Sequence, residues 1–233
     1  MTAMIELHIA NKNYSSWSLR PWCLMKALNI PFIEKMHYFT ESGVPNGFLD
    51  VSPNAKLPVL IDGEIRVWDT LSITEYLAES YPGVWPSAKP IRAWARSACA
   101  EMHSGFNTLR KDCSMNVGVR VQLRRISDAL KSDIARMENL WADGLDRFHG
   151  PWLAGSQFSA VDAFFAPVAF RFRTYGISLN DRSQAYVDRL LSHSALMQWE
   201  REAICETSRD KAHDQEIDRV GVIVKDLRIS TLS

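Results

Sequence analysis

The sequence of 233 residues has no excess of charge of either sign, no long apolar run and no paired cysteines. Lysine and arginine number 27 together, as do aspartate and glutamate, so the chain offers no general field that would attract nucleic acid or an anionic membrane. The longest apolar run covers residues 163–170, whereas a membrane-spanning helix needs about 20 residues. We therefore expect neither a nucleic-acid partner nor a membrane span.

The four cysteines lie far apart and form no CxxC pair, which excludes the usual zinc and dithiol redox motifs. Glu6 interrupts the apolar N-terminal stretch, where a signal peptide would have an unbroken core. These features predict a cytoplasmic protein. The sequence also lacks the GxSxG, HExxH, P-loop and GxGxxG patterns in their required settings, and we expect no metal site.

The length suits two compact domains of modest size. Hydrophobic residues make up 46% of the chain, enough to bury a core without a partner. Proline, glycine and serine cluster over residues 83–90, which is typical of a linker. We predict a first domain over residues 1–82 and a second over residues 91–233.

The first domain alternates strand and helix patterns. Residues 5–10 alternate apolar and polar side chains, which predicts a strand, and a loop then leads to a helix with Pro21 in its first turn. Residues 32–38 suit a second strand. Asp62-Gly63 joins two apolar runs and predicts a hairpin, because this pair accepts positive φ angles. A helix is expected over residues 70–81.

The second domain has helical spacing throughout. Apolar residues fall on one face over 91–109 and again over 119–148, which predicts two long amphipathic helices. Two shorter helices are expected over 184–191 and 194–204, and the tail from Glu206 has no clear period.

A helix buried on all sides is predicted over residues 161–172, because nearly every residue there is apolar. Ser159 and Asp162 mark its start as a variant of the capping box, in which each side chain bonds the backbone amide of the other residue. This helix should form the core of the second domain.

Two serines, Ser15 and Ser16, lie between the end of the first strand and the next helix. Free backbone amides and the helix dipole favour an anion at such a place, including a thiolate. The ordinary explanation is that one serine caps the helix while the other is solvated.

Three further features follow along the first domain. Pro58 is at the start of a predicted strand. Proline is unusual there unless the strand lies at the edge of a sheet or the Leu57-Pro58 peptide bond is cis. A cis bond would leave the Leu57 backbone free to pair with a peptide-like ligand. Asp69 and Thr70 precede a helix and suit the ammonium and carboxylate of an amino acid, although either is also an ordinary cap. Lys56 is suited either to pair with a ligand carboxylate or to be an ordinary solvated lysine on the surface.

In this order the features resemble the glutathione transferase family. They are Ser-Ser-x-Ser-x-Arg after the first strand, Leu-Pro-x-Leu at the hairpin, an acid and a hydroxyl before the next helix, and the capping box of the second domain. The resemblance covers residues 5–204. Within the family, the sequence most resembles bacterial members with a serine-type active site, of the zeta- or theta-like kind. The resemblance implies a thioredoxin-like α/β domain followed by an all-helical domain.

The resemblance implies that glutathione lies extended against the first domain. Leu57 would then pair with its cysteinyl backbone, Asp69 and Thr70 with its γ-glutamyl end, and Lys56 with a carboxylate. A hydroxyl of the serine pair would donate to the sulfur, because a hydrogen bond to the thiolate lowers the pKa of the thiol. The family also implies a homodimer.

Two patterns within the family point to different serines. Counting back from Arg20 places Ser16 where Ser-x-Pro-x-Arg classes have their catalytic serine, whereas zeta-like classes with paired serines use the first, which is Ser15 here. The zeta-like pattern favours Ser15. That pattern continues with cysteine, but this chain has Trp17, so cysteine-dependent chemistry is not implied.

The small electrophile is expected to contact the second domain and the serine loop. The candidates are Trp17, Met102, Phe106, Arg171 and Tyr175, although residues of these types at helical spacing more often serve core packing or lie on the surface. Arg171 and Arg173 beside Tyr175 favour an acidic co-substrate. The leading hypothesis is a transferase with glutathione as co-substrate, and the alternatives are a glutathione-dependent isomerase of a maleylacetoacetate- or maleylpyruvate-type acid and a non-catalytic interaction module.

Overall fold

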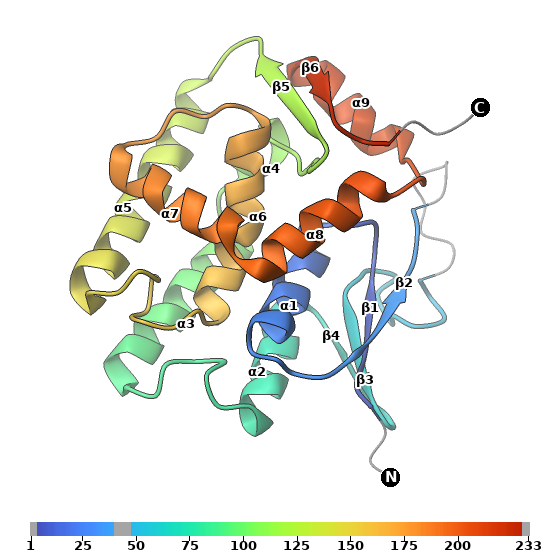
Figure 1. Cartoon of the computed structure of the whole chain (residues 1–233), viewed down its shortest axis with the longest axis vertical. Coiled ribbons are helices and arrows are strands. Elements are labelled where there is room, and N and C mark those ends of the chain that lie inside the picture. The colour runs from blue at the N-terminus through green and yellow to red at the C-terminus, as the bar shows by residue number, and fades with distance from the viewer. Residues whose placement is uncertain (1–3, 40–47, 230–233) are drawn as a thin grey trace.

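The first part of the chain forms a four-stranded sheet with two helices beside it (Figure 1). The computed structural model describes residues 4–39 and 48–229. In chain order the elements are β1 (Glu6–Ile9), α1 (Ser16–Ala27), β2 (Ile33–Met36), β3 (Val59–Asp62), β4 (Ile65–Trp68) and α2 (Thr70–Ser80). The strand order is β2-β1-β3-β4; β1 is parallel to β2, and the other neighbours are antiparallel. This mixed sheet confirms the predicted thioredoxin-like domain.

The predicted hairpin is present between β3 and β4. Asp62 pairs with Ile65 across a two-residue loop, and Gly63 has a φ of 61°, a conformation that glycine adopts without steric penalty. The Tyr76 hydroxyl donates to Asp62 Oδ2 at 2.7 Å. This bond fastens α2 to the end of the hairpin.

Helix α1 begins earlier than the sequence predicted. Its N-cap is Ser15, whose Oγ accepts a hydrogen bond from the Ser18 amide at 3.3 Å. Pro21 therefore lies inside the helix rather than in its first turn. Proline has no amide hydrogen to donate to the carbonyl four residues earlier, that of Trp17. The serine cap, not the proline, sets the start of this helix.

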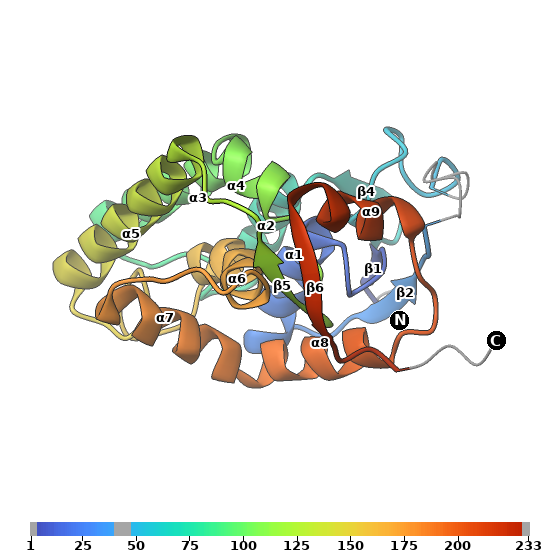
Figure 2. The same cartoon turned by 90° about the horizontal axis from the view of Figure 1, so that it is seen from above.

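Helices dominate the second part of the chain. They are α3 (Lys89–Ser104), α4 (Asn107–Asp112), α5 (Asp128–Phe148), α6 (Ala160–Thr174), α7 (Asp181–Ser192), α8 (Ser194–Cys205) and α9 (Lys211–Val220). Helix α6 is buried along nearly its whole length, as predicted, and packs against α1, α3 and α7. Figure 2 shows the sheet on one side of the molecule and α3, α5 and α7 on the other. The two parts meet where α1 packs against α6 and α8 and where α2 packs against α3.

Two predictions about the second part are wrong. Residues Val119–Leu123 form strand β5, not the start of a helix, and pair antiparallel with strand β6 (Gly221–Asp226) from the tail. The first predicted helix ends at Ser104, and Phe106 has a φ of 56° before α4 begins. The spacing of valines at 119 and 121 fits a strand as well as a helix, and only the distant partner β6 decides between them.

The four cysteines are free, and all but Cys205 are buried. Burial raises the pKa of the Cys23 thiol, as expected for a cysteine that packs in the core. Across residues 4–39 and 48–229, no helix combines the length and the apolar character that crossing a membrane would need.

The start of α6 is fixed by a buried carboxylate. Asp162 accepts hydrogen bonds from the amides of Leu153 and Ser159, each at 3.0 Å, and from the Tyr186 hydroxyl at 2.9 Å. The hydrogen bond from the Ser159 amide to the Asp162 carboxylate is one of the two bonds of the predicted capping box. Burial nevertheless raises the pKa of Asp162 to about 6.

We expect Asp162→Ala to lower the free energy of unfolding by about 3–5 kcal/mol, because it leaves three buried donors without an acceptor. Asp128→Ala is the matched control, since Asp128 also lies in a first helical turn but its side chain is 98% exposed; its loss should stay below about 1 kcal/mol. Urea unfolding measures both variants. A loss below about 1 kcal/mol for Asp162→Ala would contradict this role.

Candidate functional site

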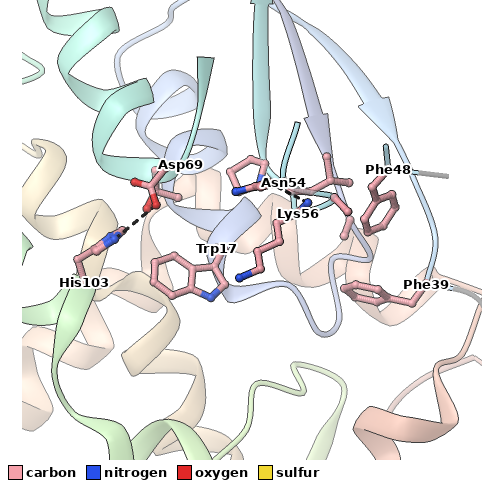
Figure 3. A pocket seen from close by; sticks show the side chains of 12 residues that line it. Trp17, Phe39, Phe48, Asn54, Lys56, Asp69 and His103 are labelled. Atoms are coloured by element: carbon pink, nitrogen blue, oxygen red, sulfur yellow. Dashed lines mark hydrogen bonds and ion pairs between the residues drawn. The ribbon is translucent and has the colours of Figure 1, made fainter. Parts of the chain in front are cut away.

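A cavity of about 440 Å³ lies where the end of β1 meets α1, the turn before β3, the start of α2 and the end of α3 (Figure 3). Its size is within the range of small-molecule sites. Six residues predicted for the site line it together: Trp17, Lys56, Leu57, Pro58, Asp69 and Thr70. The lining also includes residues that sequence reasoning did not identify, among them Phe39, Phe48, Asn54 and His103.

The turn before β3 is held by its own polar groups. The Ser52 hydroxyl donates to the Lys56 carbonyl at 2.6 Å, and the Lys56 amide donates to Asn54 Oδ1 at 3.0 Å. The Leu57-Pro58 peptide bond is cis, so the trans alternative is wrong. These contacts fix the backbone on one wall of the cavity.

Asp69 and Thr70, at the start of α2, both line the cavity. Asp69 caps α2, with its Oδ1 accepting from the Leu71 amide at 2.9 Å, and has a φ of 75°. Such a φ is uncommon for a residue with a side chain and often marks a functional position. Thr70 Oγ1 is buried and has no hydrogen-bond partner within the described residues. A buried polar atom without a protein partner is what a ligand or water would satisfy.

The serine pair does not line the cavity. Ser15 Oγ donates to Ser18 Oγ at 2.8 Å, and Ser18 Oγ in turn accepts from the Ala10 amide at 3.1 Å. Ser16 Oγ accepts from Arg171 Nη2 at 3.2 Å. Both serines are buried, while Ala10 and Trp17 on either side of them line the cavity. The serines therefore lie next to the cavity but outside its lining, and each keeps 6% of its surface exposed.

Positively charged side chains cluster around Trp17 and the serine pair. The guanidinium carbons of Arg20 and Arg110 lie 4.2 and 4.9 Å from the centroid of the Trp17 ring. Arg20 is fully buried, and its Nε and Nη1 have no hydrogen-bond partner in the described parts of the chain. Burial, reinforced by the charges of Arg110 and Arg171, holds the pKa of Arg20 well below its ordinary value.

Arg171 completes this group, which we call the arginine cluster (Arg20, Arg110 and Arg171). Its Nη1 donates to the carbonyls of Arg110, at 3.2 Å, and of Cys113, and within residues 4–39 and 48–229 it makes no hydrogen bond to a carboxylate. Burial and the charge of Arg110 lower the pKa of Arg171 to about 10. Three guanidinium groups near the N-terminus of α1 favour an anion there.

The other predicted electrophile contacts do not line this cavity. Met102 and Phe106 are buried where α3 passes into α4. The Tyr175 hydroxyl is 3.2 Å from Ser114 Oγ, and burial raises the pKa of Tyr175 to about 12. Arg173 is paired with Glu200 at 2.6 Å. Of the five candidates, only Trp17 reaches the cavity lining.

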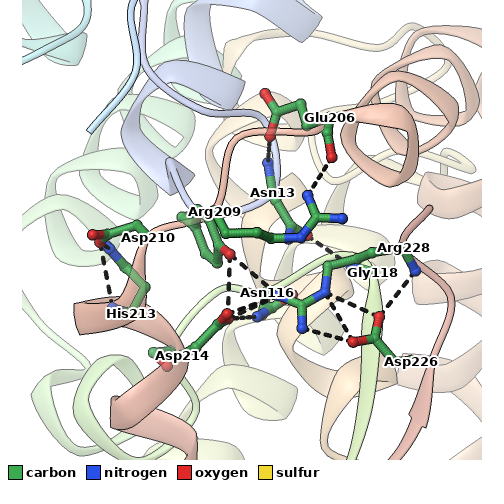
Figure 4. Close-up of polar contacts among 12 residues, drawn as sticks. Asn13, Asn116, Gly118, Glu206, Arg209, Asp210, His213, Asp214, Asp226 and Arg228 are labelled. Atoms are coloured by element: carbon green, nitrogen blue, oxygen red, sulfur yellow. Dashed lines mark hydrogen bonds and ion pairs between the residues drawn. The ribbon is translucent and has the colours of Figure 1, made fainter. Parts of the chain in front are cut away.

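The loop before the serines is held by the C-terminal tail, to which sequence reasoning assigned no element (Figure 4). The buried Glu206 carboxylate accepts from the amides of Lys12 at 2.6 Å and Asn13 at 3.1 Å. Asn13 Oδ1 accepts from the Gly118 amide at 2.8 Å, which ties the loop to the residue just before β5. No local sequence signal links residues so far apart in the chain.

Helix α9 adds a second set of contacts. Asp214 Oδ1 accepts from the Tyr14 hydroxyl at 3.2 Å and from Arg228 Nη1 at 2.9 Å. The His213 ring stacks on Tyr14 and lies 4.9 Å from the ring of Phe39, which lines the cavity. The tail thus supports both the serine loop and one wall of the site.

No group of three or more His, Cys, Asp or Glu side chains among residues 4–39 and 48–229 is placed to hold a metal ion.

Comparison with known proteins gives matches to both parts of the chain. Residues 14–80 match the family model of the glutathione S-transferase N-terminal domain, and residues 120–199 match that of the C-terminal domain. Glutathione S-transferase DHAR2 of Arabidopsis thaliana is 32% identical over 152 residues, or 65% of this chain and 63% of that protein. The matched region thus spans less than two thirds of this relative's length.

Solved structures share the fold at low sequence identity. A glutathione transferase homolog from Burkholderia GL BGR1 with bound glutathione has a TM-score of 0.65 at 18% identity, covering 86% of this chain and 98% of the other. The theta class glutathione S-transferase of Xanthomonas axonopodis pv. citri, with glutathione bound, has a TM-score of 0.63 at 21% identity, covering 85% and 97%.

We expect Glu206→Ala to lower the free energy of unfolding by about 2–4 kcal/mol at pH 8, because two buried amides lose their acceptor. Glu138→Ala is the control: Glu138 also accepts a backbone amide, that of Asn180, but in an exposed setting, and should cost less than about 1 kcal/mol. Urea unfolding gives both values, and equal losses would contradict the role of the tail.

The same carboxylate predicts a pH dependence. Burial raises the pKa of Glu206 from 4.5 to about 7, so between these values the folded protein binds a proton that the unfolded chain does not. The contribution of Glu206 to the free energy of unfolding should therefore fall as pH rises from 4.5 to 7. Subtracting the stability curve of Glu206→Gln from that of the wild type isolates this effect; parallel curves would disprove it.

Proposed function

The chain belongs to the glutathione S-transferase family, and from this premise we propose that it ionises the thiol of glutathione for attack on a small electrophile. Glutathione would lie in the cavity beside β3 and α2, with its sulfur directed toward the N-terminus of α1. The arginine cluster, in which Arg20 and Arg171 are buried and make no hydrogen bond to a carboxylate within the described residues, is the observation that carries the proposal.

The cavity lining supports the binding of an extended tripeptide. The cap bond of Asp69 leaves its other carboxylate oxygen, Oδ2, available to the γ-glutamyl ammonium. Thr70 has a buried hydroxyl with no partner in the described parts of the chain, and it suits the neighbouring carboxylate. Lys56 supplies a cation for the glycyl carboxylate. Leu57 lies on the cavity wall, where its backbone would pair with the cysteinyl residue.

The charges behind Trp17 support ionisation of the thiol. A thiol with a pKa near its reference value of about 8.5 is mostly protonated at neutral pH. A fall of about two pKa units, equivalent to about 2.7 kcal/mol, makes it mostly ionised. Hydrogen bonds to the charged form and nearby cations both act in this direction. The arginine cluster and the end of α1 supply that environment.

The hydrogen-bond directions favour Ser16 over Ser15 as the donor to sulfur. Ser15 already gives its one hydroxyl proton to Ser18 while capping α1. Ser16 accepts from Arg171 and keeps its own proton for a ligand, and the guanidinium makes that hydroxyl a stronger donor. We therefore assign the cap to Ser15 and the sulfur contact to Ser16, in contrast to the zeta-like pattern.

We expect Ser16→Ala to lower kcat/KM for 1-chloro-2,4-dinitrobenzene about 10- to 100-fold near neutral pH, because the thiolate loses its donor. The pKa seen in the kcat/KM profile should rise by about one unit or more. Ser15→Ala is the control and should instead lower the free energy of unfolding by about 1 kcal/mol while leaving that pKa in place.

The two variants separate the possible errors. A raised kinetic pKa in Ser15→Ala alone would reverse the assignment, and an unchanged pKa in both would refute activation by serine. Wild-type protein that binds glutathione but turns over no electrophile would be a non-catalytic interaction module instead.

A further inference from the structure

His103 reaches the cavity from α3 and lies beside Asp69 (Figure 3). Its Nε2 is 3.4 Å from Asp69 Oδ2, and its ring meets Trp17 edge to face at 5.1 Å. Its Nδ1 is buried and has no hydrogen-bond partner within the described residues. Because Asp69 Oδ1 is already bonded to the Leu71 amide, Oδ2 is the oxygen left for a ligand, and this is the oxygen that His103 faces.

The charges around His103 come from three elements. Asp69 lies at the start of α2, Arg20 on α1 and Arg110 on α4. Burial lowers the pKa of His103; the charge of Asp69 acts to raise it, and the two arginines act to lower it further. The net result is a neutral imidazole at physiological pH, which leaves the negative charge of Asp69 uncompensated by His103.

We propose that His103 and the α-ammonium group of a γ-glutamyl ligand compete for Asp69 Oδ2. The inference rests on the proposed function, since it concerns the same glutathione site. When the imidazole is neutral, Asp69 offers a full negative charge to the ammonium. When it is protonated, the imidazolium pairs with Asp69 at the observed contact and repels the ammonium next to it. His103 thus makes ligand binding depend on pH and on a free α-ammonium.

The experiment measures the Kd of S-hexylglutathione by calorimetry from pH 7.5 to pH 5, because this ligand has no thiol to titrate. We expect the Kd of the wild type to rise about threefold or more toward pH 5, since only the neutral imidazole permits binding. In His103→Gln the change should be less than about twofold. His37→Gln is the matched control, because His37 also has a lowered pKa and contacts Phe48 of the lining, yet it should keep the wild-type dependence.

A second ligand tests the proposal on unmodified protein. Replacing the α-ammonium of S-hexylglutathione with hydrogen should abolish the pH dependence in the wild type, because His103 then has no cation to exclude. Persistence of the dependence with this analogue, or in His103→Gln, would overturn the proposal. A wild-type protein that fails to bind S-hexylglutathione at any pH would instead overturn the proposed glutathione site, and this inference with it.

Discussion

Buried positive charge that makes no hydrogen bond to a carboxylate within the described residues is the constraint on which the rest of this structure depends. Among the residues that the structure describes, the Nε and Nη1 atoms of Arg20 have no hydrogen-bond partner, and its guanidinium lies against the rings of Trp17 and Phe164. These ring contacts recover only part of the cost of removing a guanidinium from water. Arg110 and Arg171 add to that charge from α4 and α6. Helices from both parts of the chain therefore converge on one place that is suited to an anion.

The position of the arginine cluster and of the neighbouring N-terminus of α1 is set by residues from opposite ends of the chain. Glu206 and Asp214 in the tail hold the loop that leads from β1 into α1. His213 supports Phe39 and Tyr14 by ring contacts. The C-terminal tail and the Ser15 cap both hold this loop in place. Together they fix the position of the N-terminus of α1 relative to the cavity lining. Ordering of this kind prepares a binding site before the ligand arrives.

Local signals predicted much of the fold, because each depends on neighbours in the sequence. The Asp62-Gly63 turn, the Asp162 cap and the apolar run of α6 are of this kind. The β5–β6 pair joins segments about 100 residues apart, and local periodicity does not encode such a pairing. For the same reason His103 and the burial of the serines behind Trp17 were not foreseen: each depends on contacts between separate helices.

The central claim is that this buried charge stabilises a thiolate, and the ionisation of glutathione bound to the wild-type protein tests it most directly. The measurement is the ultraviolet absorption of the thiolate in the complex across pH, with the S-hexylglutathione complex as the blank. The account predicts a thiol pKa at least about one unit below the reference of about 8.5. A bound thiol that ionises at or above that reference would contradict it.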